Sequence, residues 1–167
     1  MVETKLLWWI PFLPLLGAAR LAAPVDGHTL VFDGGHTFVK RGVITARSGQ
    51  ITALAHLPGV PAPCDRAVEV SPAFARHVRD TLADLIVGTW QTVIEAGHPL
   101  TDSATLGLSI AAYTNHGRIY PKAPGCYAPL RLLGEDVNAV LAAAISARLG
   151  HTIRVRLVHD GTAAATV

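Results

Sequence analysis

The order of short and long apolar segments after residue 28 limits the folds open to this chain. The first apolar run, Thr29 to Phe32, is followed by the turn-prone residues Asp33-Gly34-Gly35 and by a second run from Thr37 to Thr45. After the turn Arg47-Ser48-Gly49 comes a third run, Gln50 to Ala55. Short apolar runs separated by glycine-containing turns are typical of β-hairpins. We therefore expect these three runs to form an antiparallel meander.

Helices and single strands alternate in the rest of the chain. A loop with three prolines, Pro58, Pro61 and Pro63, is expected to break the sheet. Ser71 and Pro72 are a typical helix start, because serine caps the first turn and proline fits its first position. From this point the apolar spacing predicts a helix at 71–97, a buried strand at 105–113 and a loop at 114–129. It then predicts a second helix at 133–149, a half-exposed strand at 152–158 and the start of a final helix at 160.

The alternation of strands with helices indicates an α/β fold. Parallel strands need long crossover connections, usually helices, so the later strands should extend the meander as parallel strands, with both sheet faces at least partly covered. The chain has 167 residues, 50% of them hydrophobic, which suits one domain with a buried core. Its net charge of +2 offers no electrostatic case for binding nucleic acid. The two cysteines, Cys64 and Cys126, are too few and too far apart in the sequence for a disulfide framework or a cysteine-based zinc site, and we expect two free thiols.

The first 27 residues are apolar and have two possible roles. Fourteen uncharged residues lie between Lys5 and Arg20, fewer than the roughly 20 that span a bilayer, and Pro11 and Pro14 interrupt them. A transmembrane helix is therefore not expected. The layout also fits a secretory leader over residues 1–23, although an acidic residue and the two prolines count against it. We expect an apolar arm that packs on the domain or serves in an interaction, with a cleaved leader as the alternative.

Two motifs make the chain resemble a known family. The segment Asp33-Gly34-Gly35-His36-Thr37, with Lys40 three residues later, is similar to the phosphate motif of the ROK branch of bacterial sugar kinases and regulators. The segment His159-Asp160-Gly161, followed by an alanine-rich stretch, is similar to the family's strand end and helix start bearing asparagine and aspartate. With the element order, these motifs make residues 28–167 resemble one lobe of the ribonuclease-H-like fold of the actin-like ATPase superfamily, as in ROK-like and hexokinase-like sugar kinases.

The resemblance implies that the first motif binds the phosphates of ATP. Gly34 and Gly35 would let backbone N–H groups approach phosphate oxygens, and Thr37 would add a hydroxyl donor. Asp33 would hold the hydrated Mg²⁺ that accompanies ATP, and Lys40 would supply positive charge. Without the resemblance, the same residues fit an ordinary hairpin turn, with Lys40 facing solvent.

The second motif implies a catalytic base. In the resembling kinases, the aspartate matched by Asp160 accepts the proton of the sugar hydroxyl that attacks the γ-phosphoryl group. A simple helix cap is the competing interpretation of Asp160. His159 stands where the family has a sugar-binding asparagine, and His36 replaces a glycine of the phosphate motif. Asn115 and His116, in the loop that contacts sugar in the family, are weaker substrate-binding candidates that equally fit an ordinary turn.

These expectations lead to one main hypothesis and one alternative. The chain is expected to be the N-terminal lobe of an ATP-dependent carbohydrate kinase, with a sugar, ATP and Mg²⁺ as its ligands and little turnover without a second lobe. The alternative is a non-catalytic sugar- or nucleotide-sensing module of the same fold. The expected protein partner is the missing second lobe or a second copy of the chain. The expected location is the cytoplasm, or outside the cell if residues 1–23 are a leader. A DNA-binding repressor is disfavoured, because residues 1–27 are too few and too apolar for a helix-turn-helix.

Overall fold

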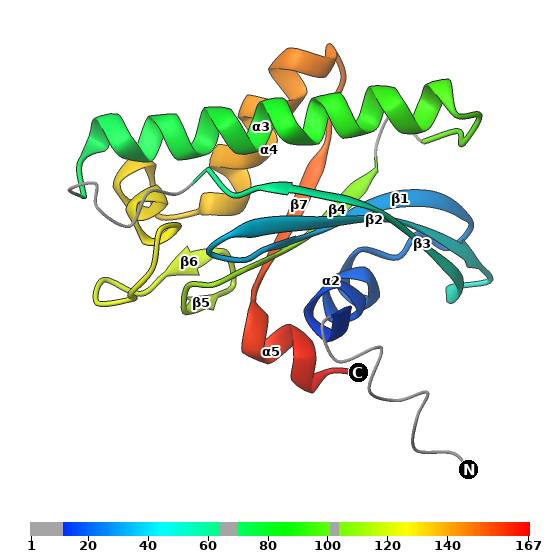
Figure 1. Cartoon of the computed structure of the whole chain (residues 1–167), viewed down its shortest axis with the longest axis horizontal. Coiled ribbons are helices and arrows are strands. Elements are labelled where there is room, and N and C mark those ends of the chain that lie inside the picture. Colours follow the sequence, from blue (N-terminus) through cyan, green and yellow to red (C-terminus); the bar gives the residue numbers. More distant parts are fainter. Residues whose placement is uncertain (1–11, 64–69, 101–103) are drawn as a thin grey trace.

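The computed structural model describes residues 12–63, 70–100 and 104–167, and within these ranges the chain forms a five-stranded sheet in the order β3-β2-β1-β4-β7 (Figure 1). The strands are β1 (Gly27–Gly34), β2 (Phe38–Arg47), β3 (Gln50–Pro61), β4 (Thr105–Ile110), β5 (Thr114–Asn115), β6 (Arg118–Ile119) and β7 (Arg154–His159). The helices are α2 (Leu13–Ala22), α3 (Pro72–Glu95), the 3₁₀-helix η2 (Ala128–Leu133), α4 (Val137–Leu149) and α5 (Asp160–Ala165).

The sheet combines an antiparallel half with a parallel half. Strand β1 pairs antiparallel with β2, and β2 pairs antiparallel with β3. On its other side β1 pairs parallel with β4, which pairs parallel with β7. Helix α3 lies in the chain between the meander and β4, and α4 lies between β4 and β7. The predicted meander, continued by parallel strands with crossover helices, is confirmed.

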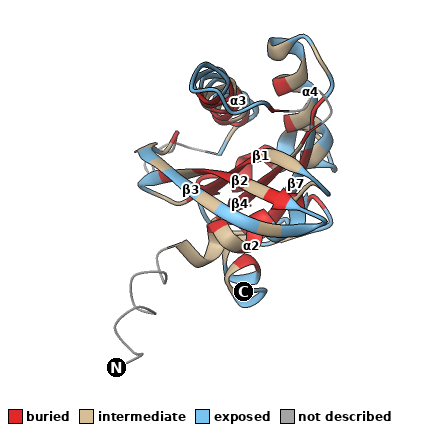
Figure 2. Cartoon of the chain, turned by 90° about the vertical axis from the view of Figure 1, so that its right-hand side faces the viewer, coloured by how far each residue is buried: buried red, intermediate tan, exposed pale blue. Residues whose placement is uncertain are grey.

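Helices cover both faces of the sheet (Figure 2). Side chains alternate between the two faces along a strand. Leu30 and Phe32 of β1 therefore join a large apolar cluster that also contains residues of α3 and α4. Val31, between them, packs instead with Leu15 of α2. The expected covering of both faces is confirmed, with α3 and α4 on one side and α2 and α5 on the other.

The start of α3 is the one that the sequence predicted. The Ser71 side chain accepts a hydrogen bond from the Phe74 N–H at 3.2 Å, and Pro72 occupies the first turn. The helix ends at Glu95, shortly before Gly97, whose φ of 85° is in the left-handed region that glycine tolerates best. One face of α3 buries a row of side chains against the sheet: Val78, Leu82, Ile86, Trp90 and Val93.

Three boundaries differ from the prediction. Strand β3 continues to Pro61, through two of the prolines that were expected to break it, because an edge strand tolerates residues that cannot donate to a ladder. Helix α4 begins at Val137 and not at Leu133, since Asp136 caps it by accepting hydrogen bonds from two backbone N–H groups. The predicted loop at 114–129 contains the β5–β6 hairpin and the first residues of η2.

Helix α2 lies directly on β4 and α5. A Cβ atom added to Gly107 would overlap the carbonyl oxygen of Ala18 in α2, and one added to Gly17 would overlap the carbonyl oxygen of Ala163 in α5. Arg20 near the end of α2 donates a hydrogen bond to the carbonyl of Thr166. This part of the N-terminal apolar segment is therefore packed on the domain. Residues 1–11 lie outside the described residues, and no helix in the described ranges is long and apolar enough to cross a membrane.

The expectation of two free thiols is wrong for Cys126. Its sulfur belongs to a disulfide bond, and the residue is only 7% exposed. Distance along the sequence does not limit which cysteines a fold brings together, which is why the spacing argument failed. Cys64, the other cysteine of the sequence, lies outside the described residues.

Candidate functional site

Three parallel strands place the two sequence motifs at one edge of the sheet. In the sheet register, Gly34 pairs with Ile110, and Ile110 pairs with His159. Neighbouring strands are about 4.8 Å apart, so the backbones of Gly34 and His159 are separated by roughly 10 Å. The turn after Gly34 and the helix that begins at Asp160 therefore lie side by side at this edge.

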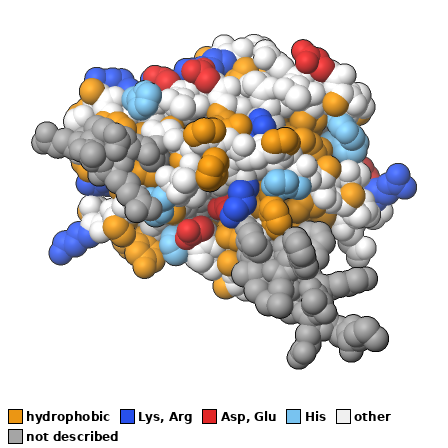
Figure 3. All heavy atoms as spheres, in the orientation of Figure 1, with side chains coloured by type: hydrophobic (Ala, Val, Ile, Leu, Met, Phe, Trp, Pro, Cys, Tyr) orange, Lys and Arg blue, Asp and Glu red, His pale blue; other side chains and the backbone are white. Residues whose placement is uncertain are grey.

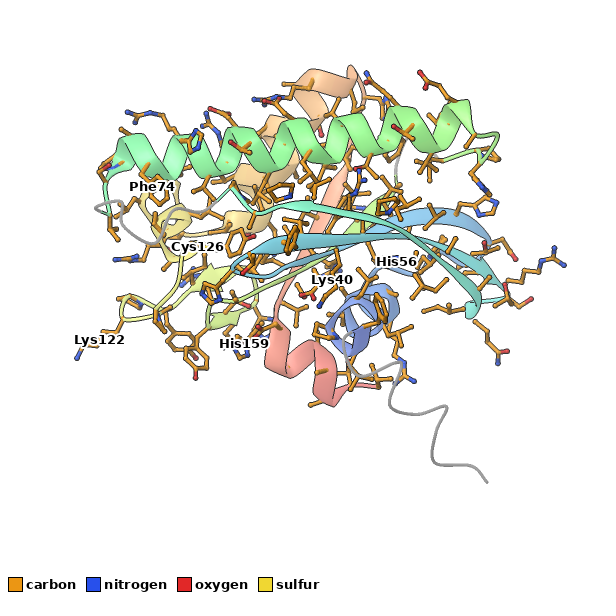
Figure 4. All side chains as sticks on the ribbon, in the orientation of Figure 1. Lys40, His56, Phe74, Lys122, Cys126 and His159 are labelled. Atoms are coloured by element: carbon orange, nitrogen blue, oxygen red, sulfur yellow. The ribbon has the colours of Figure 1, made fainter. Side chains whose placement is uncertain are left out.

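Asp33 is the centre of a buried polar cluster on the α2 and α5 side of the sheet. The residue is 4% exposed. One carboxylate oxygen, Oδ1, accepts a hydrogen bond from the Ser109 hydroxyl at 2.5 Å, and Oδ2 accepts one from the Lys40 ammonium at 2.9 Å. Figure 4 labels Lys40 and His159, which lie below the sheet in that view, on the same side as α2 and α5. Lys40 therefore does not simply face solvent, because it forms an ion pair with Asp33.

The glycine turn after β1 makes close contacts within the protein. The Gly35 N–H donates to the carbonyls of Asp33 and Phe38, both at 3.1 Å, so it is used within the turn. A Cβ atom at Gly34 would come within 3.0 Å of the Tyr127 ring, which explains a glycine here without reference to a ligand. Thr37 is exposed at the tip of the turn. A phosphate at this turn would therefore meet Thr37 rather than the N–H of Gly35.

Tyr127 supports the turn and was not singled out from the sequence. Its side chain is fully buried, and its hydroxyl donates a hydrogen bond to the Gly35 carbonyl at 3.0 Å. Burial raises the pKa of Tyr127 well above its usual value, and the negative charge of Asp33 raises this pKa further. The phenol therefore stays neutral in the folded protein under conditions in which an exposed tyrosine would ionise.

The raised pKa of Tyr127 leads to a testable pH dependence. Unfolded tyrosine ionises near pH 10. Above that pH the unfolded chain loses a proton that the folded protein retains, so folding stability should fall by about 1.4 kcal/mol per pH unit from this residue. The stability of a Tyr127→Phe variant should not fall in this way above pH 10, because phenylalanine does not ionise. At neutral pH this variant should be less stable than the wild type by about 1 kcal/mol, because the hydrogen bond to the Gly35 carbonyl is lost.

Urea unfolding of both proteins at several pH values between 8 and 11 measures the difference. We expect the wild type to be more stable at pH 8 and to lose this advantage above pH 10. The exposed Tyr113 and Tyr120 are present in both proteins and cancel. Parallel stability curves over the whole range would contradict the assigned burial of the Tyr127 hydroxyl.

Asp160 is the first residue of α5 and is held by its neighbours. The helix cap is His159, whose side chain makes no capping bond, so the interpretation of Asp160 as a simple cap is wrong. Asp160 Oδ1 accepts from the Gly161 N–H at 2.7 Å and lies 3.0 Å from His159 Nε2. The ring of Tyr113 stacks on that of His159, with centroids 4.6 Å apart. Tyr113 is a second residue of this edge that the sequence analysis did not single out.

The two weaker candidates lie on the neighbouring hairpin. Asn115 ends β5, and His116 forms the turn to β6 with a φ of 48°. The next residue, Gly117, also has a positive φ, a pair that is typical of tight hairpin turns. His116 thus has a structural role in the turn. Asn115 lines a cavity of about 570 Å³ together with Arg118 and Tyr120, and Asp160 is not part of that lining.

Asp33 does not offer an open ligand to a magnesium ion. Mg²⁺ in proteins keeps most of its waters and binds through one or two accessible carboxylate oxygens. Both oxygens of Asp33 already accept hydrogen bonds, and the side chain is buried. Among the residues that the structure describes, no group of three or more histidine, cysteine or acidic side chains is arranged to hold a metal. The residues present do not fit direct magnesium coordination at Asp33.

Comparison with known proteins gives structural but no sequence matches. No protein-family model and no curated protein matches the sequence. An inorganic polyphosphate/ATP-glucomannokinase from Arthrobacter sp. strain KM is 20% identical, with a TM-score of 0.49, over 80% of this chain and 44% of that chain. The hexokinase of Schistosoma mansoni, solved with glucose, is 12% identical, with a TM-score of 0.51, over 80% of this chain and 29% of that chain. Another hexokinase is 16% identical, with a TM-score of 0.51, over 92% of this chain and 40% of that chain.

The two hexokinase matches establish the fold. At these identities the likeness concerns the fold alone, and the chain spans less than half the length of each protein that it matches. The resemblance drawn from the sequence is confirmed at the level of the fold: the described residues form an α/β fold that is shared with the two hexokinases.

Proposed function

We propose that this chain is the N-terminal lobe of an ATP-dependent carbohydrate kinase, with residues 28–167 forming the lobe. The observation that carries the proposal is the register of Gly34, Ile110 and His159 in one row. This row brings the phosphate-type turn and Asp160 to the same edge of a lobe whose fold is shared with hexokinases. A second lobe, or a second copy of the chain, would supply the remaining contacts to ATP.

The proposed reaction is phosphoryl transfer to a sugar hydroxyl. The hydroxyl oxygen attacks the γ-phosphorus of ATP, a new P–O bond forms, and the bond to the bridging oxygen breaks to release ADP. The hydroxyl proton passes to Asp160, whose Oδ2 is the free oxygen because Oδ1 already accepts from Gly161. Thr37, exposed at the tip of the turn, would contact the phosphates, and the partly exposed Lys40, which is paired with Asp33, would add positive charge near them. No step is assigned to magnesium, given the geometry of Asp33.

The test separates sugar binding from phosphoryl transfer. Binding of a panel of hexoses to this chain is measured by NMR, and ADP release is measured with the product of the gene read to its natural stop codon. Asp160→Asn should keep sugar binding and lower transfer at least about 100-fold, the usual range for losing a general base. Glu95→Gln, an exposed acid at the end of α3, is the matched control. No binding of any sugar, or transfer unchanged in Asp160→Asn, would contradict the proposal.

A non-catalytic sensing module is the second candidate function. It is favoured by His159, which replaces the family's asparagine and lies 3.0 Å from Asp160, so the candidate base already has a partner. His36 in place of a glycine of the phosphate motif supports the same alternative. Calorimetric sugar binding without any transfer by the same gene product would favour sensing over catalysis.

The proposed location is the cytoplasm, where ATP is available to such a kinase. The disulfide at Cys126 supports the alternative of an exported protein, because disulfides persist mainly in oxidising compartments. Mass spectrometry of the protein from its native source decides between them. An intact N-terminus fits the cytoplasm, and cleavage near residue 23 fits export.

A further inference from the structure

A cavity between the β5–β6 hairpin and η2 lies apart from the two motifs. Its volume is about 570 Å³, within the range of about 300 to 1,000 Å³ that is usual for small-molecule sites. One wall consists of Ile119 of β6 and the next two residues, Tyr120 and Pro121. The other wall is the end of η2, at Arg131 and Leu132. Two segments that are separate in the chain therefore line one hollow.

The walls of this cavity are mainly apolar. Ile119 belongs to the large apolar cluster of the protein. Tyr120 and Leu132 are large side chains that stay exposed, at 53% and 43%. Exposed apolar side chains that gather in a hollow, and are not scattered singly over the surface, are typical of binding sites. A ligand with an apolar body would gain free energy by removing them from water.

The polar groups of the cavity carry more positive than negative charge. Nη2 of Arg118 lies 3.1 Å from Oε2 of Glu135, so the charges of these two lining residues offset each other. Arg131 lines the same cavity and donates one hydrogen bond, from Nη1 to the Ala128 carbonyl at 2.8 Å. Within the described part of the chain, the other N–H donors of its planar guanidinium have no partner. Arg131 is therefore available to an anionic ligand.

We propose that this cavity binds a small amphipathic carboxylate, with its apolar body against Tyr120 and Leu132 and its carboxylate on Arg131. Hydrogen bonds from arginine to a carboxylate are charge-assisted, and the planar guanidinium matches the two carboxylate oxygens. A neutral apolar molecule would leave the donors of Arg131 unmatched, and a simple anion would leave the apolar walls exposed. A ligand that has both parts uses both features of the cavity.

This site is independent of the proposed kinase function. Asp33, Thr37, Lys40 and Asp160 do not line the cavity, and Asn115 is the one sugar-binding candidate that does. A sugar bound through Asn115 is therefore the competing occupant, and the test includes it. On the face shown in Figure 3, Lys and Arg side chains are dispersed among acidic, histidine and apolar ones, so no cluster of cations on that face competes for a carboxylate.

The test compares four probes on the whole chain by NMR: naphthylacetate, its neutral analogue naphthylethanol, acetate and glucose. We expect saturable binding of naphthylacetate with a Kd of about 1 mM or below, and shifts of the Ile119, Tyr120 and Leu132 N–H groups. The alcohol has the same rings and should bind about fivefold more weakly, because it lacks the ion pair. Acetate and glucose should leave these N–H groups unshifted.

Two substitutions change the charge of the cavity in opposite directions. Arg131→Gln should reduce binding of naphthylacetate to the level of the alcohol and leave binding of the alcohol unchanged, which shows that the cavity is intact. Glu135→Gln releases Arg118 and should strengthen binding of naphthylacetate by about two- to fivefold. Arg154→Gln, which replaces an exposed arginine on β7, is the control and should alter the binding of neither probe.

Leu132→Ser tests the apolar part of the site and should weaken binding of both naphthyl probes by at least about threefold. Leu21→Ser, at a similarly exposed leucine near the end of α2, is its matched control. Equal binding of the acid and the alcohol, or glucose shifts at the same N–H groups, would overturn the proposal. The same conclusion follows if naphthylacetate does not bind saturably, if Arg131→Gln keeps the preference for the acid, if Glu135→Gln binds it more weakly, or if Leu132→Ser binds both probes as the wild type does.

Discussion

Replacing Gly107 by valine should lower the free energy of unfolding by about 3 kcal/mol or more, at the upper end for an overpacked core position. The added Cβ would overlap the carbonyl of Ala18 and approach the Ala22 side chain to 3.0 Å. Because the first obstacle is helix backbone, no rotamer change relieves the overlap. Helix α2 would have to move off β4, which would expose the cluster of Leu15, Val31 and Ile44. Urea unfolding at pH 7 measures the loss.

Gly88→Ala is the matched control for this prediction. Gly88 lies on the exposed side of α3, and a Cβ atom there would meet nothing within 4 Å. Alanine removes the entropic cost of glycine in a helix, so this variant should be more stable than the wild type by about 1 kcal/mol. A Gly107→Val protein as stable as Gly88→Ala would mean that α2 does not rest on β4 as described.

Gly107 and Gly88 also show which features of the fold could be predicted from the sequence and which could not. The order of strands and helices could be predicted, because each long element carries its own pattern, such as the Ser71-Pro72 start of α3. The position of α2 could not, because nothing near Gly107 in the sequence indicates which segment approaches it. The two-residue strands β5 and β6 are too short for any periodicity to detect.

The residues of the candidate site also fall into those that the sequence could place and those that it could not. Asp33 and Asp160 could be placed at one edge from topology alone, since parallel strands end together. The hydrogen-bond partners of this site that are distant in sequence could not be predicted. Ser109 is 76 residues from Asp33, to which it donates, and Tyr127 is 92 residues from Gly35, to which it donates. The apolar run that contains Ser109 indicates a buried strand. It does not indicate which polar side chain in that strand forms a hydrogen bond, or with what partner. A polar residue inside an apolar run was the one available signal.

Lys40→Met should lower the free energy of unfolding by about 2 kcal/mol, because it leaves the carboxylate of Asp33 buried with only Ser109 as a partner. Breaking a buried ion pair from one side typically costs about 3 to 5 kcal/mol. The expected loss is smaller here because the Lys40 side chain is 33% exposed and already partly solvated. Lys122→Met, at a position that points away from the fold in Figure 4, should change stability by less than about 0.5 kcal/mol.

The double variant Lys40→Met with Asp33→Asn decides whether charge or packing causes the loss. It removes the carboxylate charge together with its partner, and the asparagine oxygen can still accept from the Ser109 hydroxyl. Replacing both members of a buried pair is usually far less costly than removing one. The double variant should therefore recover most of the stability that Lys40→Met loses, as measured by urea unfolding at pH 7. If it is no more stable than the single variant, the lysine acts through its aliphatic chain, and the ion pair is not what holds the start of β2 to the end of β1.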